Sequence, residues 1–75
     1  MGRQKAMRHI ETKQGLERLL AKMDKIAADK PAKDLPEYDY WYKVVKGCIE
    51  EGLAMDETDY ELAPRWFRNL WTGLK

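Results

Sequence analysis

Residues 34–53 read DLPEYDYWYKVVKGCIEEGL, and this stretch decides the fold. Its apolar side chains recur every three or four positions, which is the spacing of one face of an α-helix. Asp34 is suited to cap the first amides, Pro36 is tolerated in a first turn, and Glu37 follows the cap by three residues. We therefore predict a helix over about 36–54. Its buried stripe comprises Tyr38, Trp41, Val44, Val45, Cys48, Ile49 and Leu53.

The same periodicity predicts an earlier helix at about 12–29. Thr12 is suited to cap its start, and Pro31 limits its end because the residue before a proline is pushed out of helical geometry. Ile10 falls off the apolar stripe of this helix, so residues 1–11 are expected to form a basic arm. The stripe itself comprises Leu16, Leu19, Leu20, Met23, Ile26 and Ala27.

A short third helix is predicted at about 64–72. Its apolar face comprises Trp66, Phe67, Leu70, Trp71 and Leu74. The preceding segment, residues 55–63, is acidic. Thr58 and Glu61 match a capping box there, but Pro64 would interrupt the resulting helix in its second turn. We therefore expect only a short turn between the second and third helices.

No segment alternates apolar and polar residues over more than a few positions, so no sheet is expected. The predicted fold is all-α: a small helical bundle made of an antiparallel hairpin of the first two helices plus a short C-terminal helix. The connection of about six residues between the first two helices has a length typical of such a hairpin. The chain has 75 residues, which suit a single helical domain, 1–75, and are too few for a deep enzymatic cleft beside a core.

One histidine and one cysteine provide little catalytic or metal-binding chemistry. We interpret His9 as exposed near the arm and Cys48 as a buried, inert thiol on the second helix; a Cys/His nucleophilic pair is the disfavoured alternative. Two soft ligands do not close a tetrahedral metal site, and the sequence contains no glycine-rich phosphate-binding motif. We therefore expect no enzyme, no catalytic residue, no metal, no cofactor and no small-molecule substrate.

The sequence also carries information about the cellular compartment. No apolar run approaches the roughly 20 residues that span a bilayer, and the basic N-terminus lacks the apolar run of a signal peptide. The single cysteine excludes an internal disulfide, which secreted domains of this size usually need. These features favour a cytoplasmic protein without a membrane span.

The net charge of +1 conceals a strong segregation along the chain. Residues 1–33 carry nine basic and four acidic groups, residues 34–62 carry two and nine, and residues 63–75 carry three and none. The successive net charges are therefore +5, −7 and +3. Internal complementarity would place the basic first and third helices beside the acidic second one, with each exposed pair worth about 0–1 kcal/mol. The alternative is a bipolar surface that meets partners of opposite charge.

Eight aromatic residues are more than a three-helix core of this size needs. We interpret Trp41, Trp66 and Phe67 as core residues. Tyrosine, tryptophan and arginine are enriched at the hot spots of protein interfaces. A partner-binding or self-association surface is therefore predicted, and its residues are Tyr40, Tyr42, Trp71, Arg65 and Arg68.

The function predicted from these features is that of a small interaction module, an adaptor, regulator or inhibitor that binds another protein or forms a homodimer. Such compact chains without catalytic residues are typical of regulators and of inhibitors encoded by phages or plasmids. The alternative is an accessory DNA- or RNA-binding regulator that contacts phosphates through the arm and the first helix. Its contact residues would be Arg3, Lys5, Arg8 and Lys13. The alternative ranks second because the helix connections are too long for a helix-turn-helix.

Overall fold

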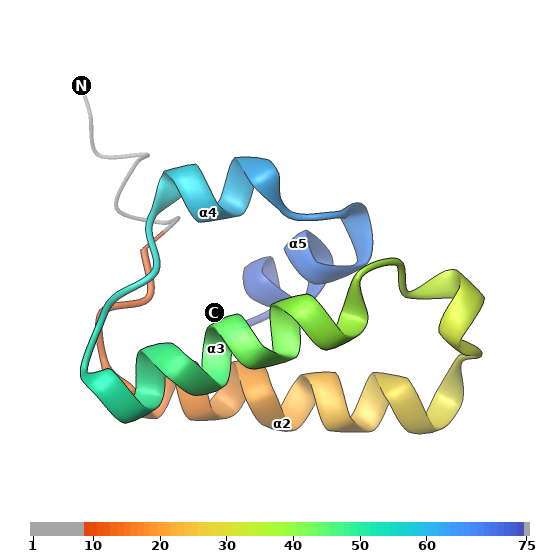
Figure 1. Cartoon of the computed structure of the whole chain (residues 1–75), viewed down its shortest axis with the longest axis horizontal. Coiled ribbons are helices and arrows are strands. Elements are labelled where there is room, and N and C mark those ends of the chain that lie inside the picture. The colour runs from red at the N-terminus through yellow and green to blue at the C-terminus, as the bar shows by residue number, and fades with distance from the viewer. Residues whose placement is uncertain (1–8, 75) are drawn as a thin grey trace.

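The computed structural model describes residues 9–74. In these residues the chain forms four α-helices and one short 3-10 helix, so the all-α prediction is confirmed (Figure 1). α2 and α3 lie side by side and run in opposite directions, which confirms the predicted hairpin. In chain order the elements are α2 (Lys13–Asp29), η1 (Ala32–Asp34), α3 (Tyr38–Glu51), α4 (Glu57–Leu62) and α5 (Arg65–Thr72).

α2 forms where the apolar periodicity predicts a helix. Thr12 caps its start, because its hydroxyl oxygen accepts a hydrogen bond from the Gly15 N–H at 3.0 Å. The helix ends at Asp29, and the C-cap Lys30, directly before Pro31, has an extended backbone, as expected from the restriction that a proline imposes on its predecessor. Its buried face consists of Leu16, Leu19 and Met23.

α3 is shorter than the predicted helix at both ends. The chain first turns through η1, so that Glu37 precedes the helix and the predicted cap Asp34 lies too far upstream to serve it. At the other end Gly52 adopts a left-handed backbone (φ 70°), which terminates the helix. Leu53 therefore lies beyond the helix and is 55% exposed, so its predicted place in the buried stripe is wrong.

The acidic segment 55–63 contains a helix, α4, where the sequence predicts only a turn. The Asp56 carboxylate accepts hydrogen bonds from the N–H groups of Thr58 (3.0 Å) and Asp59 (3.4 Å). The Asp59 carboxylate in turn accepts the Asp56 N–H at 3.1 Å. These bonds complete a capping box, which satisfies amides that the first turn leaves without helical partners.

The capping box lies two residues before the Thr58/Glu61 match that the sequence offers. The register of that match would place Pro64 inside the helix. In the observed register the helix ends at Leu62 with Ala63 as its C-cap, and Pro64 instead precedes the first residue of α5. The proline therefore separates two helices and breaks neither.

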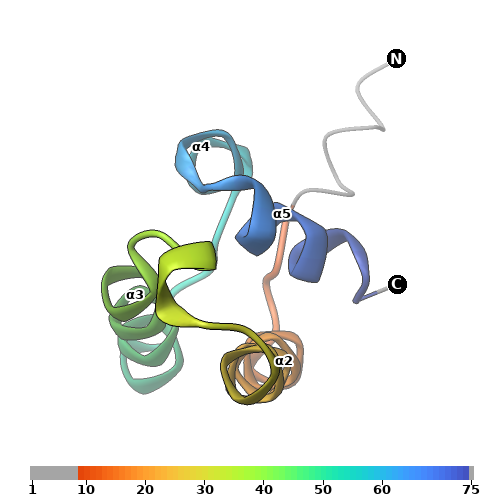
Figure 2. The same cartoon turned by 90° about the vertical axis from the view of Figure 1, so that its right-hand side faces the viewer.

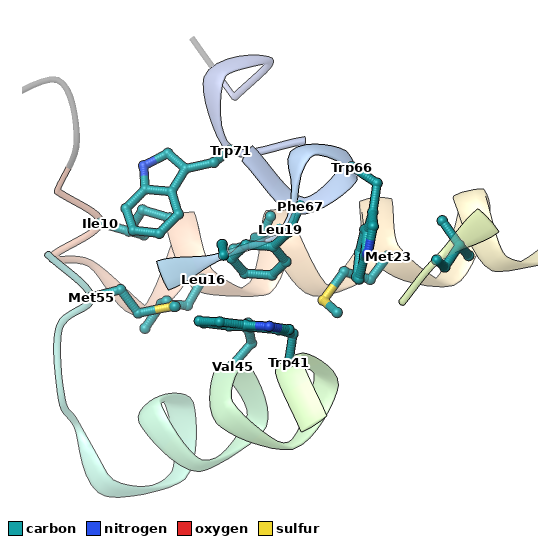
Figure 3. Packing of buried hydrophobic residues seen from close by; sticks show 12 residues of the cluster. Ile10, Leu16, Leu19, Met23, Trp41, Val45, Met55, Trp66, Phe67 and Trp71 are labelled. Atoms are coloured by element: carbon teal, nitrogen blue, oxygen red, sulfur yellow. The ribbon is translucent and has the colours of Figure 1, made fainter. Parts of the chain in front are cut away.

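The core lies between α2, α3 and α5 (Figure 3). Phe67 is completely buried at its centre, with ring centroids 4.9 Å from Trp41 and 5.6 Å from Trp66. These three residues are buried as predicted. The remaining buried apolar residues are Ile10, Leu16, Leu19, Met23, Leu35, Val45, Met55, Ala63 and Trp71.

Ile10 is part of this core, so the predicted arm of residues 1–11 is too long. Ile10 and Met55 form an isolated antiparallel bridge: the Ile10 N–H donates to the Met55 carbonyl at 2.9 Å, and the Met55 N–H donates back at 3.0 Å. Gly15 leaves room for this packing, because a Cβ at that position would lie 2.9 Å from the Ile10 Cγ2. The segment before α2 is thus joined to the α3–α4 connection.

Part of the acidic segment lies away from α2. Residues 50–61 contain six acidic and no basic residues and lead into α4. Figures 1 and 2 place α4 and α2 on opposite sides of the molecule. α3, the helix that internal complementarity would place beside α2, does pack against it. The predicted packing of the first helix beside the second is therefore found, whereas α4 carries its acidic residues away from α2.

Candidate partner-binding site at the α2–α3 turn

The turn between α2 and α3 borders a groove of about 360 Å³ that reaches Tyr40. Figure 2 looks onto this end of the molecule, with the turn at the front. The groove combines apolar and charged side chains. The apolar and aromatic ones are Ala27, Ala32, Leu35, Tyr38 and Tyr40, and the charged ones are Lys30, Glu37 and Asp39.

Three contacts hold the turn in place. The Trp66 indole N–H donates to the Pro36 carbonyl at 2.9 Å, which links the turn to α5. The Tyr38 hydroxyl donates to the Met23 carbonyl at 3.0 Å, which links the start of α3 to α2. Leu35, directly before Pro36, is buried in the core. The groove is therefore pre-formed, a property that lowers the entropic cost of binding.

Glu37 has an unusual backbone for a residue with a side chain. Its φ of 62° and ψ of 26° lie in the left-handed helical region, and it is the one non-glycine residue with positive φ in the described part of the chain. This conformation costs roughly 1–2 kcal/mol for an L-residue other than glycine. Strained residues of this kind occur preferentially at functional sites.

Tyr40 occupies the exposed position that the sequence predicts. Its side chain is 59% exposed, and its ring meets that of Trp41 edge-on at 5.2 Å between centroids. Tyr42, two positions further on, is half-buried and stacks on Tyr38 at 5.7 Å. Of the two predicted tyrosines, Tyr40 therefore offers the larger surface to a partner.

The environment of the turn raises the pKa of two of its phenols. Burial, and then the negative charge of Asp24, raises the pKa of Tyr38 above its ordinary value near 10, with smaller contributions from Tyr42 and Asp39. Desolvation and the same Asp24 carboxylate also raise the pKa of Tyr42. The raised pKa extends to higher pH the range in which the Tyr38 hydroxyl donates to the Met23 carbonyl.

Trp71 does not lie on a surface, and its predicted exposure is wrong. It is only 2% exposed. Its ring packs edge-to-face against Tyr60 at 5.3 Å and against Phe67 at 6.1 Å. Figure 3 shows it beside Ile10, the residue expected in the arm. Trp71 therefore closes the core at the end away from the α2–α3 turn and offers no anchor to a partner in this conformation.

The two predicted arginines differ in their surroundings. Arg68 donates from its Nε to the Ala63 carbonyl at 2.9 Å, and its guanidinium carbon lies 5.9 Å from the centre of the Tyr60 ring. It therefore joins α5 to the end of α4. Arg65 is exposed and borders a second groove of about 340 Å³, which shares Lys30 with the groove at Tyr40. The structure thus brings Arg65 and Tyr40 to the same end of the molecule.

The residues of the nucleic-acid alternative are described only in part. Arg3, Lys5 and Arg8 lie outside the described residues. Lys13 is exposed at the first position of α2. The structure therefore provides no geometry for a phosphate-binding arm.

The two soft nucleophilic candidates lie on different elements. Cys48 is half-buried in α3, where burial, and then the charges of Asp59 and Glu51, raises the pKa of its thiol. A thiol of raised pKa is a poor nucleophile at neutral pH. His9 is exposed ahead of α2. Within residues 9–74, no group of three or more His, Cys, Asp or Glu side chains is placed to hold a metal ion.

The helices of the described residues are short or polar relative to the roughly 20 apolar residues that a bilayer requires. None of them is both long enough and apolar enough to cross a membrane. The predicted absence of a membrane-spanning helix therefore holds for this part of the chain.

Most of the groove residues are not identified as site residues by their sequence. Leu35, Glu37 and Asp39 carry no motif, and Glu37 looks like part of a helix cap. One usable signal is the pair of prolines, Pro31 and Pro36, which restrict the backbone on both sides of the turn. Comparison of the chain with protein families, with curated proteins and with solved structures gives no match.

Proposed function

We propose that this chain is a small cytoplasmic protein that binds another protein through the end of the molecule that carries Tyr40, and so acts as an adaptor, regulator or inhibitor. The observation that supports the proposal is the 59% exposure of Tyr40 beside a pre-formed groove. Exposed tyrosines next to pockets are typical anchors of protein interfaces, because a large ring is buried at a small loss of conformational entropy.

Tyr40 differs from the other large exposed apolar residues because it lies beside the groove at the α2–α3 turn. Leu53 and Leu62 are 55% and 70% exposed, but they lie at the ends of α3 and α4, outside the residues that border the groove at Tyr40. Scattered single apolar residues are normal on a protein surface. An exposed aromatic residue beside a groove with an apolar lining is a better candidate for an anchor.

The proposal is tested by photo-crosslinking with p-benzoylphenylalanine in place of Tyr40 in the source cell. A matched chain carries the same group in place of Leu62. We expect a cross-linked partner from position 40 that is absent from position 62. With that partner purified, Tyr40→Ala is expected to weaken binding about tenfold, which corresponds to about 1.4 kcal/mol. Leu62→Ala, which removes an even more exposed side chain, should leave the affinity unchanged.

Two results would overturn the proposal. One is equal affinity of the Tyr40→Ala and wild-type chains for the cross-linked partner. The other is cross-linking of the same partner with equal yield from positions 40 and 62. Sedimentation of the purified chain identifies the case in which the partner is a second copy, because the Tyr40→Ala substitution would then shift a dimer toward the monomer.

A further inference from the structure

We propose that the groove at the α2–α3 turn receives a lysine or arginine side chain of the partner. This inference rests on the proposed function and adds the chemistry of the side chain that is bound. Glu37 and Asp39 line the groove, and both are exposed. Lys30 is the one basic residue among the lining residues, so the lining has a net charge of −1.

Two helix ends meet at this groove. The last carbonyls of α2 have no helical donors and carry the negative end of its dipole. Ala27, which lines the groove, is an example: the residue four positions later is Pro31, which has no N–H to donate. Lys30, the C-cap of α2, and the uncapped amino end of α3 oppose this potential, so the preference for a cation rests on the carboxylates of Glu37 and Asp39.

The apolar part of the groove suits the stem of a long cationic side chain. Ala27 and Ala32 are exposed and provide small aliphatic surfaces, whereas Leu35 is almost completely buried. Lysine and arginine bury their methylene stems on such surfaces while the charged head stays near water or acceptors. The exposed ring of Tyr40 lies along the same groove, and the face of a tyrosine ring attracts a cation.

Other side chains fit the groove less well. An apolar side chain would take water from the carboxylates of Glu37 and Asp39 and would offer no hydrogen bond in return, which is costly. An acidic side chain would meet the like charges of Glu37 and Asp39. A cationic side chain pairs with the carboxylates and also covers the apolar lining.

The inference is tested with capped pentapeptides in an NMR titration of the ¹⁵N-labelled full chain. The peptides are Ac-Ala-Leu-Arg-Leu-Ala-NH₂ and two versions with norleucine or glutamate in the central position. We expect the arginine peptide to shift the amide signals of the groove residues and to bind at least about threefold more tightly than the norleucine peptide. We expect no saturable shift at these amides with the glutamate peptide.

The matched variants are the pair Glu37→Gln and Asp39→Asn, combined in one chain, and Glu50→Gln as a control for a general loss of negative charge. Glu50 is exposed on α3 and does not line the groove. The double variant should lose the preference for arginine over norleucine, whereas the control should keep it. Unchanged amide spectra away from the substitutions show that the variants are folded.

Equal or tighter binding of the norleucine peptide would overturn the inference, as would shifts confined to residues outside the groove. The peptides test the groove without the natural partner. If Tyr40→Ala weakens the natural complex and the arginine preference is absent, the proposed function stands and this inference fails. If the preference is present and Tyr40→Ala leaves the natural complex unchanged, the groove binds cations but the proposed function fails.

Discussion

The two ends of α3 are built in different ways. At its C-terminal end local sequence explains every feature: Gly52 supplies the left-handed residue, and the Leu53 N–H donates to the Cys48 carbonyl at 2.9 Å. Asp56 then caps the next helix. At the N-terminal end Glu37 takes the left-handed conformation that suits glycine, and no side chain caps the helix.

The N-terminal end of α3 holds its shape through tertiary contacts instead. The hydrogen bonds from Trp66 to Pro36 and from Tyr38 to Met23 connect it to α5 and α2. A segment that departs from local preferences and is held from outside is expected at functional sites more often than elsewhere. The groove borders this end, and the contrast between the two ends therefore agrees with the proposed site.

The first prediction concerns the hydrogen bond from Trp66 to Pro36, which helps to hold the N-terminal end of α3. Trp66→Phe removes the indole N–H that binds the Pro36 carbonyl and part of a buried ring. We expect a loss of about 2 kcal/mol in the free energy of unfolding, from the unsatisfied carbonyl and the lost packing. Chemical denaturation measures the loss. Amide hydrogen exchange should accelerate most at residues 35–40.

Trp71→Phe is the matched control for this substitution. Trp71 is also buried, but its indole N–H has no hydrogen-bond partner within residues 9–74. The control removes the same atoms without breaking a hydrogen bond, so its loss of stability should be smaller and exchange at residues 35–40 unchanged. If the two variants give the same exchange pattern, the bond from Trp66 does not hold the turn.

The second prediction concerns the caps on either side of α3. Asp56→Ala removes the side chain that accepts two amide hydrogens at the start of α4. We expect a loss of about 1 kcal/mol in the free energy of unfolding. Asp34→Ala makes the same chemical change at the residue that the sequence suggests as the cap of α3, and should cost less than about 0.5 kcal/mol. Equal losses would show that Asp34 caps a helix after all.

The helices that pack on one another were predictable from sequence. Leu16, Leu19 and Met23 of the predicted stripe are buried, because a 3.6-residue period can bury one face whatever the neighbouring helix is, whereas Ala27 at the end of the stripe is exposed. α4 was harder, since Asp56 and Thr58 both suit a cap and the position of Pro64 favoured the idea of a turn. Whether the helix is capped by Asp56 or by Thr58 depends on tertiary contacts, which cannot be derived from the periodicity of the sequence.

The candidate site was predictable only at Tyr40. Trp71 carries the same interface preference as Tyr40, but Ile10 and Tyr60 approach it from distant parts of the chain and bury it. The bridge between Ile10 and Met55 joins segments 45 residues apart in the sequence, and no local pattern announces it. The groove also depends on long-range contacts, from Trp66 to Pro36 and from Tyr38 to Met23. Because the local sequence does not contain these contacts, Glu37 and Asp39 could not be distinguished from ordinary residues at the start of a helix.

The third prediction removes the difference between the two ends of α3. Glu37→Gly gives the N-terminal end the residue that Gly52 supplies at the other end. A left-handed backbone costs roughly 1–2 kcal/mol for glutamate, while glycine loses roughly 0.5–1 kcal/mol more conformational entropy on folding, so we expect a net gain of about 0.5 kcal/mol in the free energy of unfolding. Gly52→Ala places a side chain in the same backbone region and should cost about 1 kcal/mol. Denaturation of the two variants measures both effects, and a loss of stability in Glu37→Gly would show that Glu37 makes a contact worth more than its strain.

Since Glu37→Gly also removes one carboxylate from the groove, the same variant should bind the arginine peptide more weakly while it unfolds less readily. Glutamate at this position would then have been retained for binding at a cost in stability.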